Sequence, residues 1–181
     1  MRVISGSARG TALISPEGRE VRPTLDRVKE AVFSMLGADI SEKNVLDLFS
    51  GSGALGIEAL SRGAKAAVFV DMSRSSLDIT RQNLHKTRLE DRALCVLNDF
   101  SAFLKENKQS FELVFLDPPY REGLLGAALA SLYETDALSD NAVVVCETDD
   151  KIPFPLPVVG YELIRDRRYG RCRIFVLTKK R

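Results

Sequence analysis

From Asn44 onward, short apolar runs alternate along the chain with segments of helical periodicity. This alternation is typical of βαβ units, in which parallel strands form a sheet and helices cover both of its faces. We predict strands over residues 45–49, 67–70, 93–97, 113–116 and 142–146, and helices over residues 54–62, 73–86, 101–107 and 123–133. The sequence therefore predicts an α/β fold built on a mostly parallel sheet.

The first part of the chain precedes this alternation and has a different character. Residues 1–22 contain turn-prone clusters between short apolar stretches, which predict an irregular or hairpin-like segment. Pro23-Thr24 is a typical helix start, and an apolar stripe on the following residues ends at Gly37. We therefore expect a small N-terminal extension over residues 1–37, made of a hairpin and a helix.

The last part of the chain also departs from the alternation. Three prolines within residues 152–157 exclude a helix there. Strand-like runs follow at 158–164 and 172–177, and residues 165–171 are predicted to form the loop between them. We expect a closing antiparallel hairpin, and a single domain over residues 1–181 with its core at 44–181.

Composition excludes several classes of protein. Of the 181 residues, 45% are hydrophobic and 28% are charged, which fits a globular domain and not a disordered or fibrous protein. The three cysteines, Cys95, Cys146 and Cys172, lie far apart, so neither a disulfide framework nor a zinc site is indicated. No apolar run approaches the ~18 residues of a membrane span. We expect a cytoplasmic protein that uses no metal and no membrane.

The net charge of +1 hides an uneven distribution. Residues 165–181 contain eight basic side chains and one acidic side chain, a local charge of +7, which leaves −6 on the rest of the chain. Such a basic end can attract a polyanion, and it can equally be a solvated face. Charge alone does not decide between the two.

A glycine-rich motif follows the first predicted strand. Residues 47–56 read DLFSGSGALG, which places Gly51 and Gly53 between that strand and a helix. Glycines there allow a sharp turn and a close approach of a ligand to the helix N-terminus. Asp71 stands 20 residues after Gly51, where an acidic side chain binds ribose hydroxyls. The motif predicts a nucleoside site, although its glycine spacing is shared with nicotinamide-binding proteins.

A second motif, Asp117-Pro118-Pro119-Tyr120, directly follows the strand predicted at 113–116. Two prolines cannot continue a strand, so they stiffen a loop at the carboxyl edge of the sheet, where α/β proteins bind ligands. The Asp117 carboxylate and the Pro118 carbonyl can accept the two N–H groups of an exocyclic amine, while Tyr120 stacks on the base. The motif therefore predicts group transfer to the amine of a nucleobase.

Together the two motifs resemble those of the class I S-adenosylmethionine (SAM) dependent methyltransferases that methylate amino groups of bases. The resemblance covers residues 44–181 and implies a Rossmann-like sheet of seven strands in the order 3-2-1-4-5-7-6, with the last strand antiparallel. It also implies SAM as the methyl donor and S-adenosylhomocysteine (SAH) as the product. The catalytic residues that it implies are Asp117, Pro118, Pro119 and Tyr120. The cofactor-binding residues that it implies are Asp47, Phe49, Gly51, Ser52, Gly53, Asp71, Met72, Asn98, Asp99 and Phe100.

The ends of the chain carry a narrower resemblance. Residues 2–10 (RVISGSARG) and 22–30 (RPTLDRVKE), with Tyr169-Gly170 before the last strand, are similar to the RsmD family. Those proteins are small single-domain enzymes that methylate the exocyclic N2 of one guanine in 16S ribosomal RNA. The resemblance implies an rRNA substrate. We expect that rRNA within a small-subunit assembly particle, with naked rRNA as the alternative, and we expect the protein to act as a monomer. The RNA contacts that it implies are Arg2, Arg9, Arg22, Arg27, Arg167, Arg168 and Arg171.

Three other functions fit parts of the sequence. A DNA adenine-N6 or cytosine-N4 methyltransferase would use the same Asp117 motif, but the chain lacks a large insertion for reading base edges. A nicotinamide-dependent dehydrogenase would use the glycine spacing and leave residues 117–120 without a role. A catalytically silent RNA-binding or ribosome-assembly module would use the basic ends and keep the fold as a scaffold.

Overall fold

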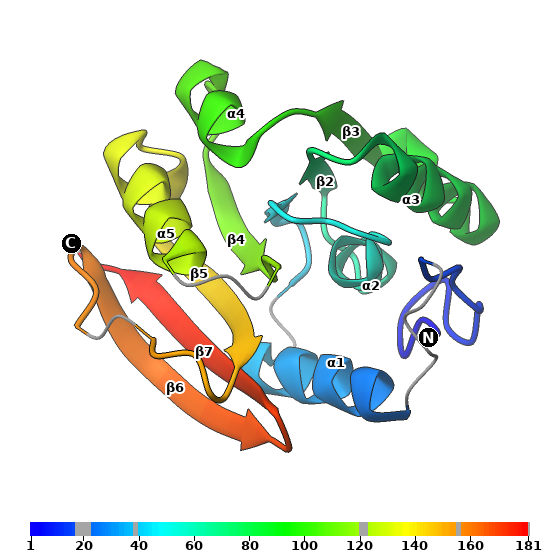
Figure 1. The fold of residues 1–181 in the computed structure, drawn as a ribbon. Coiled ribbons are helices and arrows are strands. Elements are labelled where there is room, and N and C mark those ends of the chain that lie inside the picture. Colours follow the sequence, from blue (N-terminus) through cyan, green and yellow to red (C-terminus); the bar gives the residue numbers. More distant parts are fainter. Residues whose placement is uncertain (17–22, 38–39, 120–122, 155–156, 181) are drawn as a thin grey trace.

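A seven-stranded sheet forms the centre of the protein (Figure 1). The computed structural model describes residues 1–16, 23–37, 40–119, 123–154 and 157–180. The strands are β1 (Asn44–Asp47), β2 (Ala66–Asp71), β3 (Ala93–Leu97), β4 (Phe111–Leu116), β5 (Leu138–Asp149), β6 (Tyr161–Tyr169) and β7 (Cys172–Lys179). Their order is β3-β2-β1-β4-β5-β7-β6, and β7 runs antiparallel to both of its neighbours. The predicted sheet order is therefore confirmed.

Helices cover both faces of the sheet (Figure 1). They are α1 (Pro23–Leu36), α2 (Ala54–Ser61), α3 (Arg74–Thr87), the short 3-10 helix η1 (Glu90–Arg92), α4 (Phe100–Glu106) and α5 (Leu124–Glu134). One hydrophobic core lies under α1, α2 and α3, and a second lies under α4 and α5. Strands β1 and β4 are buried because both faces are covered, which explains their continuous apolar runs. Within the described ranges, no helix is long and apolar enough to cross a membrane.

The closing hairpin differs from the prediction. The sequence places residues 165–171 in a loop, but residues 165–169 belong to β6, and the chain turns at Gly170 and Arg171. A register shift between Leu163 and Arg165 lets the pairing with β7 continue. Because β6 is an edge strand with mostly exposed side chains, it tolerates charged residues and shows no apolar alternation. The predicted loop is therefore wrong: Arg165, Arg167 and Arg168 lie on β6, and Arg171 lies in the turn.

The N-terminal residues form the expected hairpin-like segment. An antiparallel bridge joins Arg2 and Ala12, and the Val3 N–H donates to the Thr11 carbonyl at 3.0 Å. The hydroxyl of Ser61, at the end of α2, donates to the Ser5 carbonyl at 2.6 Å and accepts from the backbone N–H of Ala8 at 3.0 Å. These contacts dock the segment, here defined as residues 1–14, on α2.

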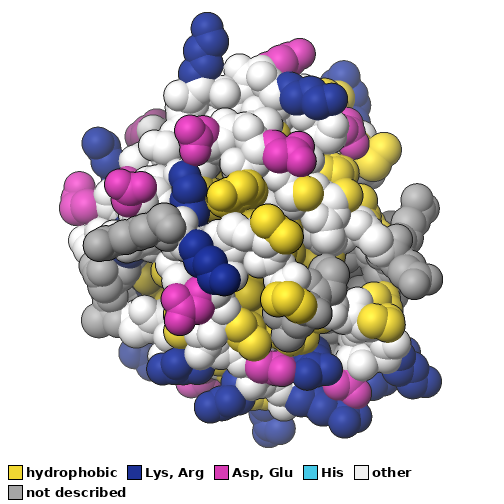
Figure 2. Space-filling view, turned by 90° about the vertical axis from the view of Figure 1, so that its left-hand side faces the viewer, with side chains coloured by type: hydrophobic (Ala, Val, Ile, Leu, Met, Phe, Trp, Pro, Cys, Tyr) yellow, Lys and Arg dark blue, Asp and Glu magenta, His cyan; other side chains and the backbone are white. Residues whose placement is uncertain are grey.

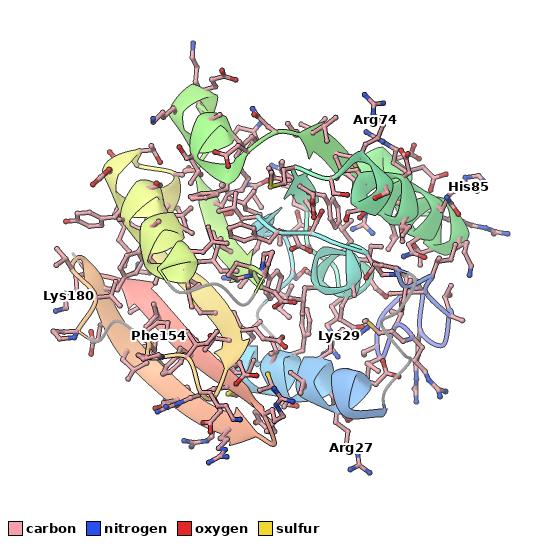
Figure 3. The ribbon with its side chains drawn as sticks, in the orientation of Figure 1. Arg27, Lys29, Arg74, His85, Phe154 and Lys180 are labelled. Atoms are coloured by element: carbon pink, nitrogen blue, oxygen red, sulfur yellow. The ribbon has the colours of Figure 1, made fainter. Side chains whose placement is uncertain are left out.

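One buried carboxylate fastens the same segment to two helices. Glu58 of α2 is fully buried and accepts hydrogen bonds from the backbone N–H groups of Ile4 and Ser5 at 2.8 and 3.0 Å. Its ion pairs with Lys29 of α1 and with Arg62 measure 3.1 and 2.8 Å. Figure 3 shows Lys29 reaching from α1 into this region. Since a buried charge is stable only when it is paired, Glu58 ties α1, α2 and the N-terminal segment together.

Two glycine substitutions test how tightly the N-terminal segment is docked. Gly6 and Gly10 both have φ of +86°, but a Cβ at Gly6 would lie 1.8 Å from the Ser61 carbonyl oxygen, whereas a Cβ at Gly10 meets nothing within 4 Å. We expect Gly10→Ala to lower the free energy of unfolding by about 1 to 2 kcal/mol, the cost of a left-handed residue. Gly6→Ala should lower it clearly more, because backbone atoms clash. Urea denaturation of both variants measures the difference, and equal losses of stability would contradict the described docking.

Candidate active site

The candidate site lies at the carboxyl edge of the sheet, between β1 and β4. The crossover direction reverses between these two neighbouring strands, so the helices that follow them leave toward opposite faces. A crevice outside the strand ends at such a point is where α/β proteins bind ligands. Asp47 ends β1, and Asp117 directly follows β4. The two acids that the sequence singles out therefore flank the same point of the sheet.

The Asp47 carboxylate is buried beneath the glycine loop, residues 50–53. Its Oδ2 accepts a hydrogen bond from the Gly56 N–H, in the first turn of α2, at 3.0 Å. Burial raises the pKa of Asp47 to about 7, the Gly56 hydrogen bond opposes that rise, and the negative charge of Asp71 adds to it. A cationic group bound nearby would favour the charged form of Asp47.

The glycine loop is held by contacts from the next strand and from α3. The backbone N–H of Gly51 donates to Asp71 Oδ2 at 2.9 Å, and the other oxygen of Asp71 accepts from the Ser73 N–H at 2.8 Å. Gly53 has φ of +75°, and a Cβ there would lie 2.8 Å from Thr80 Cγ2, so glycine is required. Asp71 thus has a fixed orientation at the end of β2, and both of its oxygens keep further lone pairs for a ligand.

Two buried residues of α3 that the motifs did not assign to the site contact the loop carbonyls. Thr80 Oγ1 donates to the Gly51 carbonyl at 3.0 Å, and Asn83 Nδ2 donates to the Ser52 carbonyl at 2.9 Å. Both side chains are fully buried. The helical periodicity of the sequence places Thr80 on the inward face of the helix. It does not predict which backbone groups the side chains of Thr80 and Asn83 bond.

The residues predicted to surround an adenine follow β2 and β3. Met72 is 78% exposed, so its side chain is accessible to a ligand. Asn98 donates its backbone N–H to the Asp71 carbonyl at 3.1 Å, which joins the ends of the two strands.

The next two residues begin α4. Asp99 Oδ1 caps this helix by accepting hydrogen bonds from the N–H groups of Ser101 and Ala102. The ring of Phe100 packs on that of Phe49, with centroids 5.4 Å apart. The structure thus brings these residues to one edge, and their binding role stays a prediction.

The loop and α2 fit a small polar ligand in two further respects. The Ser50 side chain is buried, and its hydroxyl has no hydrogen-bond partner. Among the described residues, it is the one buried side-chain polar atom in this situation. Such a group is costly unless something bonds to it. The N-cap of α2 is Gly53, which offers no side-chain oxygen to the first N–H groups of the helix. Asp47 accepts from the Gly56 N–H of this first turn, and the N-terminus of the helix still favours a bound carboxylate, while the nearby acids suit ribose hydroxyls and cationic groups.

Asp117 and Pro118 lie at the end of β4 as predicted, while Tyr120 lies outside the described residues. Asp117 is half-buried, Pro118 is buried and Pro119 is exposed. Leu116 pairs with Cys146 of β5, so Glu147 is the residue of β5 next in register to Asp117. The sequence motifs did not single out Glu147, although it directly follows the predicted strand 142–146 and could have been found from that position.

A third strand completes the surroundings of Asp117. The Cys172 thiol of β7 donates to Glu147 Oε1 at 3.2 Å. Burial raises the pKa of this thiol, and the negative charges of Glu147, Asp117 and Asp149 raise it further. Carboxylates from three positions therefore act on this thiol, and one of them, Asp149, is also paired with Arg171. Among the described side chains, no group of three or more His, Cys, Asp and Glu is arranged to hold a metal ion.

The arginines predicted to contact RNA lie on several elements, and Arg22 is outside the described residues. Arg2 pairs with Asp26 at 3.8 Å, Arg9 is exposed, and Arg27 projects away from α1 (Figure 3). Figure 2 shows Lys and Arg side chains gathered at the lower end of the molecule, with acidic side chains among them. The described arginines of this set therefore lie on several elements, and acidic side chains lie among the basic ones on the face that Figure 2 shows.

The three arginines of the closing hairpin differ in their partners. Arg168 pairs with Asp150 at 3.0 Å and Arg171 pairs with Asp149 at 3.2 Å, so acids from the end of β5 offset part of the local charge. The Arg167 guanidinium donates to a backbone carbonyl, that of Asp166, at 2.9 Å. All three guanidinium groups stay exposed to a polyanion.

A family model described as Conserved hypothetical protein 95 matches residues 1–178. The chain belongs to this family. Ribosomal RNA small subunit methyltransferase D of Escherichia coli strain K12 is 35% identical over 94% of this chain and 86% of that protein. YlbH of Bacillus subtilis, named as a candidate rRNA methyltransferase, is 37% identical over 99% of this chain and all of that protein. The solved structure of yhhF from Escherichia coli, named as a candidate methyltransferase, superposes with a TM-score of 0.89 at 33% identity, covering 99% and 98% of the two chains. The resemblance to the RsmD family is confirmed.

The raised pKa of Asp47 predicts a specific pH dependence of stability. Its pKa is about 7 in the folded protein and about 3.9 in an unfolded chain. The stability linked to the protonated form is therefore fully present below pH ~4 and is lost as the pH rises through ~7. Asp47→Asn keeps an oxygen for the Gly56 N–H but does not titrate. We expect the free energy of unfolding of Asp47→Asn, relative to wild type, to rise between pH 4 and 7 by at most about 4 kcal/mol.

Urea denaturation of the ligand-free proteins at several pH values measures this difference. Groups that titrate equally in both proteins cancel, so only Asp47 contributes. Parallel stability curves for the two proteins would show that Asp47 has an ordinary pKa in the folded state.

Proposed function

We propose that this protein is a methyltransferase that transfers the methyl group of SAM to the exocyclic N2 amine of a guanine in small-subunit ribosomal RNA. The observation that carries the proposal is the pair of acids at the switch point, Asp47 with the glycine loop on β1 and Asp117 with its prolines on β4. The names of its relatives, including a small-subunit rRNA methyltransferase, support the substrate class.

The residues around the loop would hold SAM. Asp71 would accept the ribose hydroxyls, Asp47 would face the amino end of the methionine part, and the N-terminus of α2 would face its carboxylate. Met72 and Phe100 offer apolar surface for an adenine ring. When bound, SAM supplies a methyl group carried on a positively charged sulfur, which the nearby carboxylates favour.

Asp117 would hold the guanine amine and favour its attack. A base amine is a weak nucleophile because its lone pair is delocalised into the ring, and it becomes positively charged as the new N–C bond forms. The Asp117 carboxylate can accept one N–H of the amine and the Pro118 carbonyl the other, which fixes the direction of the lone pair. The carboxylate of Asp117 would itself stabilise the developing positive charge. The amine then loses its extra proton to Asp117 or to water, so no other base is needed.

Replacing Asp117 tests the proposed function directly. The assay is transfer of labelled methyl from SAM to small ribosomal subunits that lack the native modification, with naked rRNA and duplex DNA in parallel. We expect Asp117→Ala to lower kcat by about 10²- to 10⁴-fold, because the amine loses its acceptor. SAH affinity should stay within a few-fold of wild type, because Asp117 lies on the acceptor side.

Asp140→Ala is the matched control, since Asp140 is an exposed carboxylate at the opposite end of β5. It should retain wild-type transfer. Label on DNA alone would keep the chemistry and overturn the rRNA target, and no transfer to any acceptor would overturn the proposed function. Equal loss of transfer and of SAH affinity in Asp117→Ala would place Asp117 in the cofactor site.

We further propose that the arginines of the closing hairpin contact RNA phosphates. Arg167→Gln, Arg168→Gln and Arg171→Gln in one protein should weaken RNA binding and flatten the plot of log affinity against log salt. The slope should decrease in magnitude by about 0.7 to 0.9 for each phosphate that the variant no longer neutralises. A salt series of RNA-binding titrations measures this slope.

The control removes three exposed basic residues elsewhere, with Arg81→Gln, Lys86→Gln and Lys105→Gln on α3 and α4. It changes the net charge by the same amount, so it isolates the effect of position. If both triple variants give the same slope, the hairpin arginines are a solvated face and do not bind RNA.

A further inference from the structure

The glycine loop and the N-terminal segment are linked by a single side chain, Asn83 of α3. Asn83 Nδ2 donates to the Ser52 carbonyl in the loop and to the Ile14 carbonyl in the N-terminal segment, both at 2.9 Å. Its Oδ1 accepts from the Ile14 N–H at 2.7 Å. Asn83 is fully buried. The amide therefore bridges two parts of the chain that lie far apart in sequence.

The partners of Asn83 fix the orientation of its amide and explain the choice of residue. The Ile14 N–H can only donate, so it must face the amide oxygen, while the two carbonyls can only accept and must face the nitrogen. Aspartate would lack both donors, and an apolar side chain would remove the side-chain partner of three backbone groups that are buried or partly buried. Asparagine satisfies all three groups at once.

Thr80, one turn earlier on α3, holds the preceding carbonyl of the loop. Its hydroxyl donates to the Gly51 carbonyl at 3.0 Å. In a trans peptide the N–H points opposite to the C=O, so a Gly51 carbonyl directed at α3 turns the Ser52 N–H away from α3. Together with the Asp71 contact to the Gly51 N–H, these bonds fix three backbone groups of the loop, the N–H and carbonyl of Gly51 and the carbonyl of Ser52.

We propose that Asn83 and Thr80 are positioning residues for methyl transfer, which set the backbone of the cofactor loop without touching the reacting groups. The N-terminal segment contributes to the same site, because the backbone of Ile14 bonds the Asn83 amide through both its N–H and its carbonyl. The proposal rests on the proposed function, since it assigns these two residues to the SAM loop of that reaction. Preorganised donors bind a ligand without the cost of ordering the loop.

The test compares matched variants of the full chain. Asn83→Ala removes the bridge, Thr80→Val keeps the shape and the methyl against Gly53 but removes the donor, and Thr80→Ser restores the donor. Thr87→Ala is the structural control: Thr87 is buried on the same helix, and its hydroxyl donates at 2.8 Å to the Asn83 carbonyl within α3. The readouts are SAH affinity by calorimetry, KM for SAM and kcat with the small-subunit substrate, and unfolding temperature.

We expect SAH affinity to fall by about tenfold in Asn83→Ala and by about five-fold in Thr80→Val, in the range for the removal of one or two hydrogen bonds. KM for SAM should rise by similar factors, and Thr80→Ser should return both values to within about two-fold of wild type. Thr87→Ala should lower the unfolding temperature and leave SAH affinity unchanged, which separates positioning from mere stability.

Wild-type SAH affinity in both Asn83→Ala and Thr80→Val, with both proteins folded, would overturn the proposal while leaving the proposed function intact. If Asn83→Ala does not fold, the Thr80→Val and Thr80→Ser pair decides. Failure of folded wild-type protein to bind SAH or SAM would overturn the proposed function, and this proposal with it.

Discussion

The parallel alignment of β1 with β2 and β4 is the constraint on which the rest of the structure depends. In this register Asp47 lies opposite Phe69 on one side and Phe115 on the other, both buried. Residues that follow the three strands must then meet at one edge, whatever their separation in the chain. The parallel strands thus place the residues that follow them at one edge of the sheet, and the side chains of these loops form the candidate site.

Buried hydrogen bonds and ion pairs fix the conformation of the segments at that edge. The two sheet faces are apolar and would tolerate many loop conformations, because apolar packing is not directional. Glu58 and Asn83 each satisfy backbone groups of the N-terminal segment, and Asn83 also satisfies the glycine loop. An unpaired buried group at either position would be costly, so the network favours one arrangement. The N-terminal segment, which lies outside the sheet, therefore belongs to the architecture of the site.

Sequence patterns predicted the strands of the sheet and the position of the two motifs at the ends of β1 and β4, because both depend on local sequence. The apolar runs and the glycine loop follow from a few neighbouring residues, and the resemblance to class I SAM-dependent methyltransferases supplied the strand order. Edge strand β6 was missed because its exposed faces need no apolar alternation, so Arg165 and Arg167 were predicted as loop. Thr80 and Asn83 could not be assigned partners, since contacts between α3 and residues 51 or 14 depend on tertiary structure.

The electrostatics of the site follow from the same edge. Asp47 is held beneath the loop with a raised pKa, whereas Asp117 lies half-buried near Glu147 and the Cys172 thiol. Two carboxylates at the ends of neighbouring strands thus have different environments, because Asp47 is buried and Asp117 is half-buried. The enclosed acid suits a cationic ligand that arrives with its own charge, because binding would release the proton that burial retains. The half-buried acid suits a neutral amine that acquires charge only during the reaction. In the proposed reaction, the donor would therefore lie at the end of β1 and the acceptor at the end of β4.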